Sequence, residues 1–277
     1  MKLLQLNADD KQGALQLKGT YANDTHYDHV VDDDTVVLTP DGEVLAVLVA
    51  GVISARARRK AYKHLRSIYG MPSNRATAVY RGSSLPRIRK RDGSLSRTRQ
   101  VPHSILDLLE RKGVRADVLG YLDTTPRIRK CRLSAWSLNK PEVLRGVMPF
   151  VHEVDDVFRS WIPDRYAAQL AVVHQVPGWH LHGTAFTTIT VNKNFRTAFH
   201  TDKGDLKAGF SCLATLGKFS GGLLVIPRYR VAFKIRPGSV LMMDAHEFHG
   251  NTQIAGERIS CVLCCRERIA KCGGGEA

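Results

Sequence analysis

The triplet His200-Thr201-Asp202 places two metal-ligating side chains at positions i and i+2. On extended backbone these positions share one side of a strand, so an imidazole and a carboxylate can occupy neighbouring corners of one metal ion. A third ligand must come from a distant segment, and we select His249, with His246 as the alternative. Two histidines and one carboxylate leave open positions on one face of the metal, which is typical of non-haem Fe(II) oxygenases.

Arg258 follows His249 by nine residues, and Ser260 lies on the same side of the strand that we predict there. A guanidinium offers a two-pronged fork to a carboxylate, and a hydroxyl can add one more bond. We interpret the pair as the site for the distal carboxylate of 2-oxoglutarate, whose keto-acid end would chelate the iron. The alternative is a structural arginine on a buried strand, paired with Glu257 or Glu267.

Short apolar or alternating runs, separated by Gly, Pro and Asp turns, fill the sequence after Gly183. Strands at such spacing predict a sandwich or barrel, and a jelly roll fits. A jelly roll would also bring His200 and His249 together at one end. The fold class that we predict is α+β, with a double-stranded β-helix (jelly roll) core and flanking N-terminal helices. The predicted strands are 186–191, 211–216, 222–226, 231–235, 239–243 and 259–265.

The first half of the chain predicts shorter elements of both kinds. Strands at 35–39 and 43–48, joined by a Pro-Asp-Gly turn, predict a hairpin. Residues 54–67 predict a strongly basic helix. Further helices are predicted at 104–112 and at about 153–173, the second one interrupted near Pro163.

The charge of the chain is strongly positive, with 41 Lys and Arg against 26 Asp and Glu and a formal net charge of +15. Such an excess favours contact with a polyanion, nucleic acid above all, and a merely basic protein is the alternative. Residues 71–101 carry much of this charge among glycines, prolines and serines. We predict that Arg87, Arg89 and Lys90 contact the phosphate backbone of DNA, with a solvated charged loop as the alternative.

Residues 190–205 (TVNKNFRTAFHTDKGD) resemble the iron-site strand of the TET/JBP family of 2-oxoglutarate-dependent oxygenases. They look closest to the thymine hydroxylase domain of the base J-binding proteins and its phage relatives. Segments 244–252 and 257–260 resemble the same family, residues 131–136 do so more loosely, and the resemblance covers roughly residues 120–268. We therefore divide the chain into an N-terminal basic region, 1–115, packed on or extending the core, and a TET/JBP-like dioxygenase core, 116–277.

The resemblance implies an Fe(II) enzyme that uses 2-oxoglutarate to oxidise the methyl group of a 5-methylpyrimidine in DNA. Carried over to this sequence, it assigns His200, Asp202 and His249 to the iron, and Arg258 with Ser260 to 2-oxoglutarate. The predicted reaction is the hydroxylation of 5-methylcytosine, with thymine as the next choice. The alternatives are an oxygenase acting on a protein or small molecule, and an inactive DNA-binding module.

Further residues are candidates for contact with cosubstrate or DNA. By strand parity Asn192, Asn194 and Arg196 share a side with His200, so Asn192 could reach the cosubstrate and the other two the base. Hydrogen bonding inside the barrel is the alternative for all three. A methyl group on a stacked base must reach the iron, so we expect base flipping or a single-stranded substrate. Trp136 is a candidate for stacking or wedging, and burial in the core is its alternative.

The remaining features of the composition concern membrane contact, the oxidation state of the cysteines and the location of the protein. No run approaches the roughly 20 apolar residues of a membrane span, so we expect no membrane partner, and we expect a monomer. The six cysteines are irregularly spaced, which predicts reduced thiols rather than a disulfide framework. Cys261, Cys264 and Cys265 are interpreted as small buried residues rather than metal ligands. The expected location is the cytoplasm, or the nucleus in a eukaryote.

Overall fold

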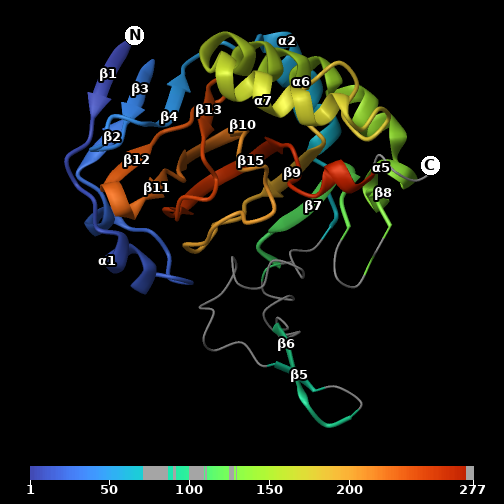
Figure 1. Ribbon diagram of the computed structural model, residues 1–277, viewed down its shortest axis with the longest axis horizontal. Helices are drawn as coiled ribbons and strands as arrows, with labels where there is room; N and C mark the ends of the chain where they lie inside the picture. The colour runs from blue at the N-terminus through green and yellow to red at the C-terminus, as the bar shows by residue number, and fades with distance from the viewer. Residues whose placement is uncertain are drawn as a thin grey trace.

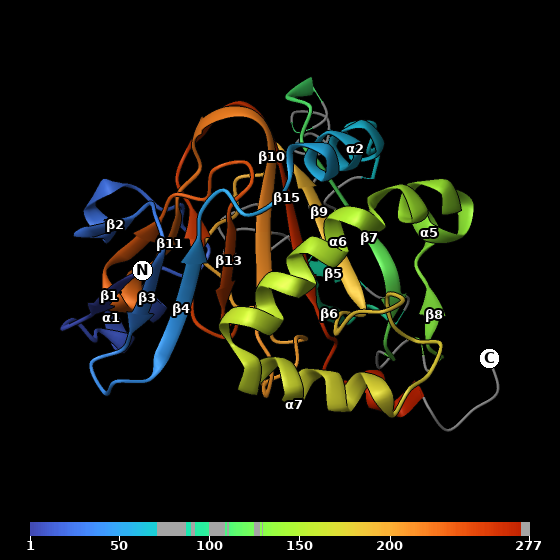
Figure 2. The same ribbon diagram turned by 90° about the horizontal axis from the view of Figure 1, so that it is seen from above.

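The computed structural model describes residues 1–70, 87–89, 92–99, 109, 111–124, 128 and 130–272. In this part of the chain a larger and a smaller β-sheet form the body, and helices cover one face of the larger sheet (Figures 1 and 2). The α+β class predicted from the sequence is confirmed.

The larger sheet has the order β1-β3-β4-β13-β10-β15-β9-β7-β8. Strands β10 and β15 are its longest, and they pair antiparallel from Cys212 opposite Leu263 to Gly221 opposite Ile254. The strands are β1 (Lys2–Gln5), β3 (Thr35–Leu38), β4 (Val44–Val49), β7 (Arg115–Leu122), β8 (Arg132–Leu133), β9 (Thr188–Lys193), β10 (Ser211–Gly221), β13 (Val240–Met243) and β15 (Ile254–Cys264).

The smaller sheet has the order β14-β11-β12-β2. It consists of β2 (His29–Val31), β11 (Leu224–Ile226), β12 (Val231–Phe233) and β14 (Gly250–Asn251). A further antiparallel pair is formed by β5 (Arg87–Arg89) and β6 (Leu95–Arg99). All six strands predicted after Gly183 have counterparts at these positions, with bounds shifted by a few residues.

The N-terminal residues supply strands to both sheets. Strands β3 and β4 form the predicted hairpin, and β4 pairs with β13 of the larger sheet. Strand β2 pairs in parallel with β12 of the smaller sheet. The strands before residue 50 therefore extend the two sheets.

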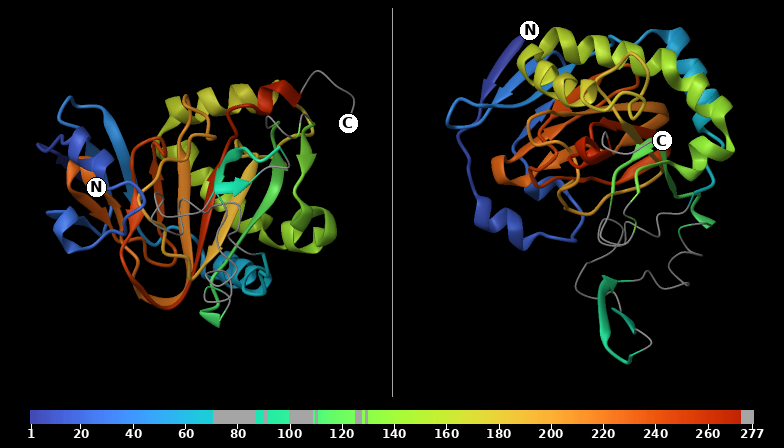
Figure 3. Two further views of the ribbon diagram at one scale, coloured as in Figure 1. Left: turned by 90° about the horizontal axis from the view of Figure 1, so that it is seen from below. Right: turned by 45° about the vertical axis from the view of Figure 1, so that its right-hand side comes forward.

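Helices form a layer over the larger sheet, seen from another direction in Figure 3. The longest is α6, which begins at Pro141 rather than near residue 153, because a proline in the first turn needs no N–H partner. The predicted break falls at Ile162, between α6 and α7. The helices are α1 (Lys11–Gln16), α2 (Ala55–Leu65), α5 (Ala135–Asn139), α6 (Pro141–Trp161) and α7 (Pro163–His174), with 3-10 turns η1 (Asp24–His26), η3 (Pro227–Tyr229) and η4 (Ile269–Cys272).

Two helix predictions have different outcomes. The basic helix predicted at 54–67 is confirmed as α2, whose N-terminus is capped by the Ser54 hydroxyl accepting the Ala57 N–H. The helix predicted at 104–112 lies largely outside the described residues. No helix in the described ranges combines the length and the apolar character that crossing a membrane requires.

Strand alternation divides the central strands between the helix layer and the space between the sheets. On β15, Ile259, Cys261 and Leu263 belong to the main apolar core under α6. Because successive side chains of a strand point to opposite faces, Arg258 and Ser260 point the other way. The same strand thus supplies a core on one face and polar groups on the other.

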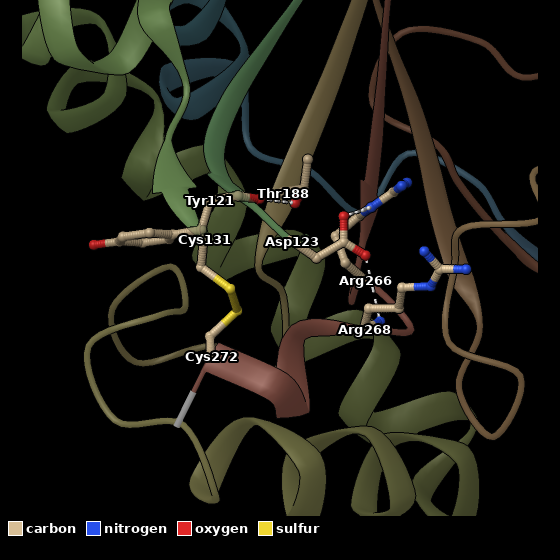
Figure 4. Close-up of a disulfide and its surroundings, with 7 residues drawn as sticks. All are labelled: Tyr121, Asp123, Cys131, Thr188, Arg266, Arg268 and Cys272. Carbon is tan, nitrogen blue, oxygen red and sulfur yellow. Dashed lines mark hydrogen bonds and ion pairs between the residues drawn. A yellow bond between two sulfur atoms is a disulfide. The ribbon is translucent and has the colours of Figure 1, made fainter. Parts of the chain in front are cut away.

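A disulfide joins Cys131, just before β8, to Cys272 at the end of η4 (Figure 4). The two Cα atoms lie 5.8 Å apart although 141 residues separate the cysteines in sequence. The prediction of reduced thiols is wrong for this pair, because such a separation leaves no spacing pattern to read. The buried positions predicted for Cys261, Cys264 and Cys265 are confirmed.

We expect the Cys131→Ser/Cys272→Ser double variant to lose about 2–5 kcal/mol of unfolding free energy, since the bond restricts the unfolded chain over a long loop. Urea denaturation of oxidised wild type and variant measures the difference. A thiol reductant should lower the wild-type midpoint toward that of the variant and leave the variant unchanged. A wild-type midpoint that does not respond to reductant would show that the cross-link does not stabilise the fold.

Candidate metal centre

Three side chains meet between the two sheets: His200, Asp202 and His249. His200 Nε2 lies 3.5 Å from Asp202 Oδ1, and His249 Nε2 lies 3.9 Å from Asp202 Oδ2. One ligand atom from each lies within 4.8 Å of both others. These separations allow one metal ion to touch all three, and the set of two histidines and one carboxylate suits Fe(II).

Paired backbone bonds bring the two histidines together. The His200 N–H donates to the His249 carbonyl at 2.9 Å, and the His249 N–H donates to the His200 carbonyl at 3.0 Å. Residues that exchange both bonds in an antiparallel pair project their side chains to the same face. Gly250 permits this approach, since a Cβ at that position would lie 2.9 Å from the Phe199 ring.

Each imidazole ring is oriented by a hydrogen bond from its Nδ1 to a backbone carbonyl. Nδ1 of His200 lies 2.8 Å from the Ala198 carbonyl, and Nδ1 of His249 lies 2.8 Å from the Glu247 carbonyl. A carbonyl oxygen can only accept, so Nδ1 carries the proton in both rings. Nε2 of each ring therefore keeps its lone pair toward the shared space, as a metal ligand requires.

His246, the alternative third ligand, is placed elsewhere. Its Nδ1 lies 2.7 Å from Asp244 Oδ1, and it does not belong to the cluster that His200 and Asp202 form. The structure thus brings His249, rather than His246, to the other two candidate ligands.

The candidate cosubstrate residues line the same cavity as the triad. Arg258 and Ser260 come from β15 and Asn192 from β9, together with Leu213, Leu224 and Val262. Arg258 is 2% exposed, and burial lowers the pKa of its guanidinium to about 10, so it remains charged near neutral pH. Among the described residues no carboxylate pairs with this guanidinium, and its Nε has no hydrogen-bond partner.

The two carboxylates that could have made Arg258 a structural residue are engaged elsewhere. Glu257 pairs with Lys193 at 2.9 Å and accepts a hydrogen bond from Tyr62, and these contacts lower the pKa of its carboxyl group. Glu267 accepts the Lys207 N–H at 2.9 Å. A buried charge without a counter-ion is costly, so Arg258 fits a site that receives a carboxylate from a bound molecule.

The alternation of side chains between the two faces of β9 does not continue beyond the end of that strand. Asn194 has a left-handed backbone (φ 52°), and its side chain accepts the Arg258 N–H at 2.9 Å. The following Arg196 donates from Nη2 to the Ala22 carbonyl at 2.6 Å and from Nε to the Asn251 carbonyl at 3.3 Å. Neither side chain lines the triad cavity, which corrects their expected approach to a base at the iron.

The other residues predicted to contact DNA are Trp136, Arg87, Arg89 and Lys90. Trp136 is 3% exposed within the main apolar core, so its stacking on a base is ruled out in this structure and its alternative, burial, holds. Arg87 and Arg89 lie on β5, and Lys90 lies outside the described residues.

A charged network that the sequence analysis did not identify supports the segment carrying Asp202. The Asp205 N–H donates to the Asp202 carbonyl at 3.1 Å, and its carboxylate accepts from Ser211 Oγ at 2.7 Å and from Arg266 Nη1 at 3.2 Å. Arg266 Nε in turn lies 3.7 Å from Asp123 (Figure 4). Burial raises the pKa of Asp205, and Arg266 opposes the rise. Sequence spacing gives no sign of this network, because 61 residues separate Asp205 from Arg266.

Comparison with known proteins identifies one family. The family model Tet_JBP, the oxygenase domain of the 2OGFeDO superfamily, matches residues 120–267. The match contains the triad, Arg258 and Ser260, and it leaves out the N-terminal strands β1 to β4. The predicted resemblance to the TET/JBP family is confirmed.

Two curated relatives are similar in sequence to part of this chain. The thymine dioxygenase JBP1 of Trypanosoma brucei brucei is 36% identical over 164 residues, which are 56% of this chain and 19% of the relative. JBP1-B of Trypanosoma cruzi strain CL Brener is 37% identical over 139 residues, 49% of this chain and 16% of the relative. This chain thus spans about a fifth of the length of the curated relatives it matches.

A solved structure supports the fold. NgTET1 in complex with 5mC DNA superposes with a TM-score of 0.56 at 14% identity, over 94% of this chain and 92% of that one. Together with the family match, this likeness confirms the double-stranded β-helix predicted from the sequence.

The geometry yields a test of the third ligand. We expect His249→Ala to weaken Fe(II) binding by more than the roughly 10–100-fold that loss of an outer partner costs, because a direct ligand is lost. His246→Ala should bind the metal like wild type. Anaerobic calorimetric titration with Fe(II) measures both, and the opposite ranking would exclude His249 as the ligand.

The Asp205–Arg266 pair yields a second test. We expect Arg266→Gln to lower Fe(II) affinity by roughly 10–100-fold, because the segment that holds Asp202 loses its anchor. Arg268→Gln is the matched control, since Arg268 has an exposed side chain two residues away. If Arg266→Gln is less stable to urea yet binds Fe(II) like Arg268→Gln, the network is structural and does not position the ligand.

Proposed function

The chain belongs to the Tet/JBP family of oxygenase domains in the 2OGFeDO superfamily, and from this premise we propose that it hydroxylates the 5-methyl group of a pyrimidine in DNA. Fe(II) and 2-oxoglutarate are the cofactor and cosubstrate of this dioxygenase. Bound together, they supply the oxidant: dioxygen gives one oxygen atom to the methyl group and one to succinate, and carbon dioxide leaves.

The observation that carries the proposal is the buried Arg258 guanidinium in the cavity of the triad. A dicarboxylate that reaches the metal with one end would neutralise this charge with the other, and Ser260 can add a hydrogen bond. We assign the distal carboxylate of 2-oxoglutarate to Arg258 and Ser260, and the three metal positions to His200, Asp202 and His249.

Other residues of the chain orient the reactants and restrict water. Leu213, Leu224 and Val262 give the cavity apolar walls, which limit water beside the reacting groups. Asn251 is held in place because its Oδ1 accepts from Thr197 Oγ1 at 2.6 Å and its Nδ2 donates to the Leu223 carbonyl at 3.3 Å. Asn192 remains a candidate for contact with the cosubstrate.

Two features favour DNA as the substrate. The formal charge of +15 suits a polyanion, and the curated relatives are thymine dioxygenases. A methyl group within a duplex cannot reach a cavity between two sheets, so the base must leave the stack or come from single-stranded DNA. We further propose that the protein acts as a monomer in the compartment that holds its DNA, the cytoplasm or the nucleus.

The choice of base is a finer proposal. From the sequence we predicted 5-methylcytosine as the first choice of substrate base. The relatives at 36–37% identity, however, are thymine dioxygenases. The 5mC DNA complex is 14% identical, which bears on fold rather than substrate. We therefore place thymine ahead of 5-methylcytosine.

Nucleoside mass spectrometry tests the proposal directly. After incubation with Fe(II), 2-oxoglutarate and DNA, we expect a nucleoside one oxygen atom heavier than thymidine, and less or none from 5-methylcytosine. Succinate should form in step with this product. The Asp202→Ala variant is the control and should give neither, since it lacks the carboxylate ligand.

Each alternative function predicts a different result. An oxygenase for a protein or small molecule would form no DNA-dependent succinate although it binds Fe(II) and 2-oxoglutarate. An inactive binding module would bind DNA but form no product with either base. Either result would overturn the proposed function.

A further inference from the structure

A second cleft lies beside the triad cavity, between the N-terminal segment 22–30 and the rim of the barrel. Its volume is about 510 Å³, within the range of pockets that hold drug-sized ligands. We call it the N-terminal cleft. Its lining includes Tyr27, Val30, Arg196, Leu223, Lys234 and Thr252.

The N-terminal cleft and the triad cavity share one wall. Consecutive residues line the two spaces in three places: Arg196 and Thr197, Leu223 and Leu224, and Thr252 and Asn251. Hydrogen bonds tie this wall together, since the Leu223 N–H donates to Thr252 Oγ1 at 2.9 Å and Thr197 Oγ1 donates to Asn251 Oδ1. A ligand in the cleft would therefore lie next to a base held at the metal.

The cleft carries a fixed positive group. The Arg196 guanidinium is held by the Ala22 and Asn251 carbonyls and lies 4.5 Å from the centre of the Tyr21 ring. Among the described residues no carboxylate pairs with it. A guanidinium has five N–H donors, so two carbonyl bonds leave donors for an anion.

Lys234 adds a second positive charge, and it too has no carboxylate partner within the described ranges. Asp24 also lines the cleft, and it accepts the Tyr27 hydroxyl at 2.7 Å. Two cations against one carboxylate leave the cleft positive. In an enzyme that acts on DNA, the anion that suits such a pair of cations is a backbone phosphate.

Part of the remaining lining is apolar, beside the polar Asn23, Thr252 and Gln253. Val30 is 49% exposed although it lies on a strand, and Leu223 and the Tyr27 ring complete this part of the cleft. Cationic groups beside an apolar and aromatic wall match the composition of a nucleotide, in which a phosphate adjoins a sugar and a flat base.

We propose that the N-terminal cleft binds a nucleotide that flanks the target base in the same DNA strand. Arg196 and Lys234 contact its phosphate, and Tyr27, Val30 and Leu223 contact its sugar and base. The inference rests on the proposed function for its ligand class. It assigns part of substrate recognition to residues before 120, which the family match does not include.

Charge reversal at Lys234 tests the cleft. We measure the affinity for a fluorescent single-stranded oligonucleotide by anisotropy, with 2-oxoglutarate, Fe(II) and no oxygen, so that no turnover occurs. Lys234→Glu should weaken binding at least about tenfold and reduce the slope of log Kd against log salt concentration by about 0.7, the value for one phosphate contact on a single strand.

Lys140→Glu is the matched control, because it makes the same charge change at an exposed lysine beside the helix layer. Val30→Asp, at an exposed position of the cleft, should also weaken binding, whereas Leu138→Asp on α5 should not. Equal affinities for Lys234→Glu and Lys140→Glu would overturn the cleft proposal.

The two proposals fail in different ways. If the wild type binds the oligonucleotide and Lys234→Glu does not, but no DNA-dependent succinate forms, the cleft stands and the proposed function falls. If product forms and Lys234→Glu binds like Lys140→Glu, the function stands and the cleft falls.

Discussion

The pair of backbone hydrogen bonds between His200 and His249 is the contact on which the metal centre depends. His200 follows β9 of the larger sheet, and His249 immediately precedes β14 of the smaller sheet. The two residues can exchange these bonds only when the sheets face one another. Packing of the whole β-structure is thus a condition for assembling three ligands, and the helix layer serves the site by stabilising the larger sheet.

Alternation along the strands lets one strand supply side chains to both the core and the site. On β15 the odd-numbered Ile259 and Cys261 pack under α6, while Arg258 and Ser260 point between the sheets. A one-residue slip in register would exchange these roles and bury the apolar side chains against the metal cavity. The apolar packing on one face therefore fixes the polar geometry on the other.

The sequence predicted those parts of the structure that depend on local pattern. The six late strands, the 35–48 hairpin and the basic helix follow from alternation, turn residues and helical periodicity, and His-x-Asp identified two candidate ligands that the structure brings together. What could not be predicted depends on contacts between distant segments or on one backbone angle. The Cys131–Cys272 bond and the Asp205–Arg266 pair join residues far apart in sequence. The left-handed backbone of Asn194 ends the strand parity from which Arg196 was predicted to reach the base.

Arg258 within β15 and Arg266, two residues after the end of that strand, differ in whether the protein itself supplies a counter-ion. Arg266 has Asp205 and Asp123 as counter-ions, so its charge is compensated within the protein, and it serves the segment that holds Asp202. Arg258 is more deeply buried and, among the described residues, has no carboxylate partner. An uncompensated buried ion costs several kcal/mol even after relaxation. A fold that keeps such a group beside three candidate metal ligands is most stable when a carboxylate enters the cavity, so binding of the dicarboxylate cosubstrate should stabilise the protein as well as prepare it for reaction.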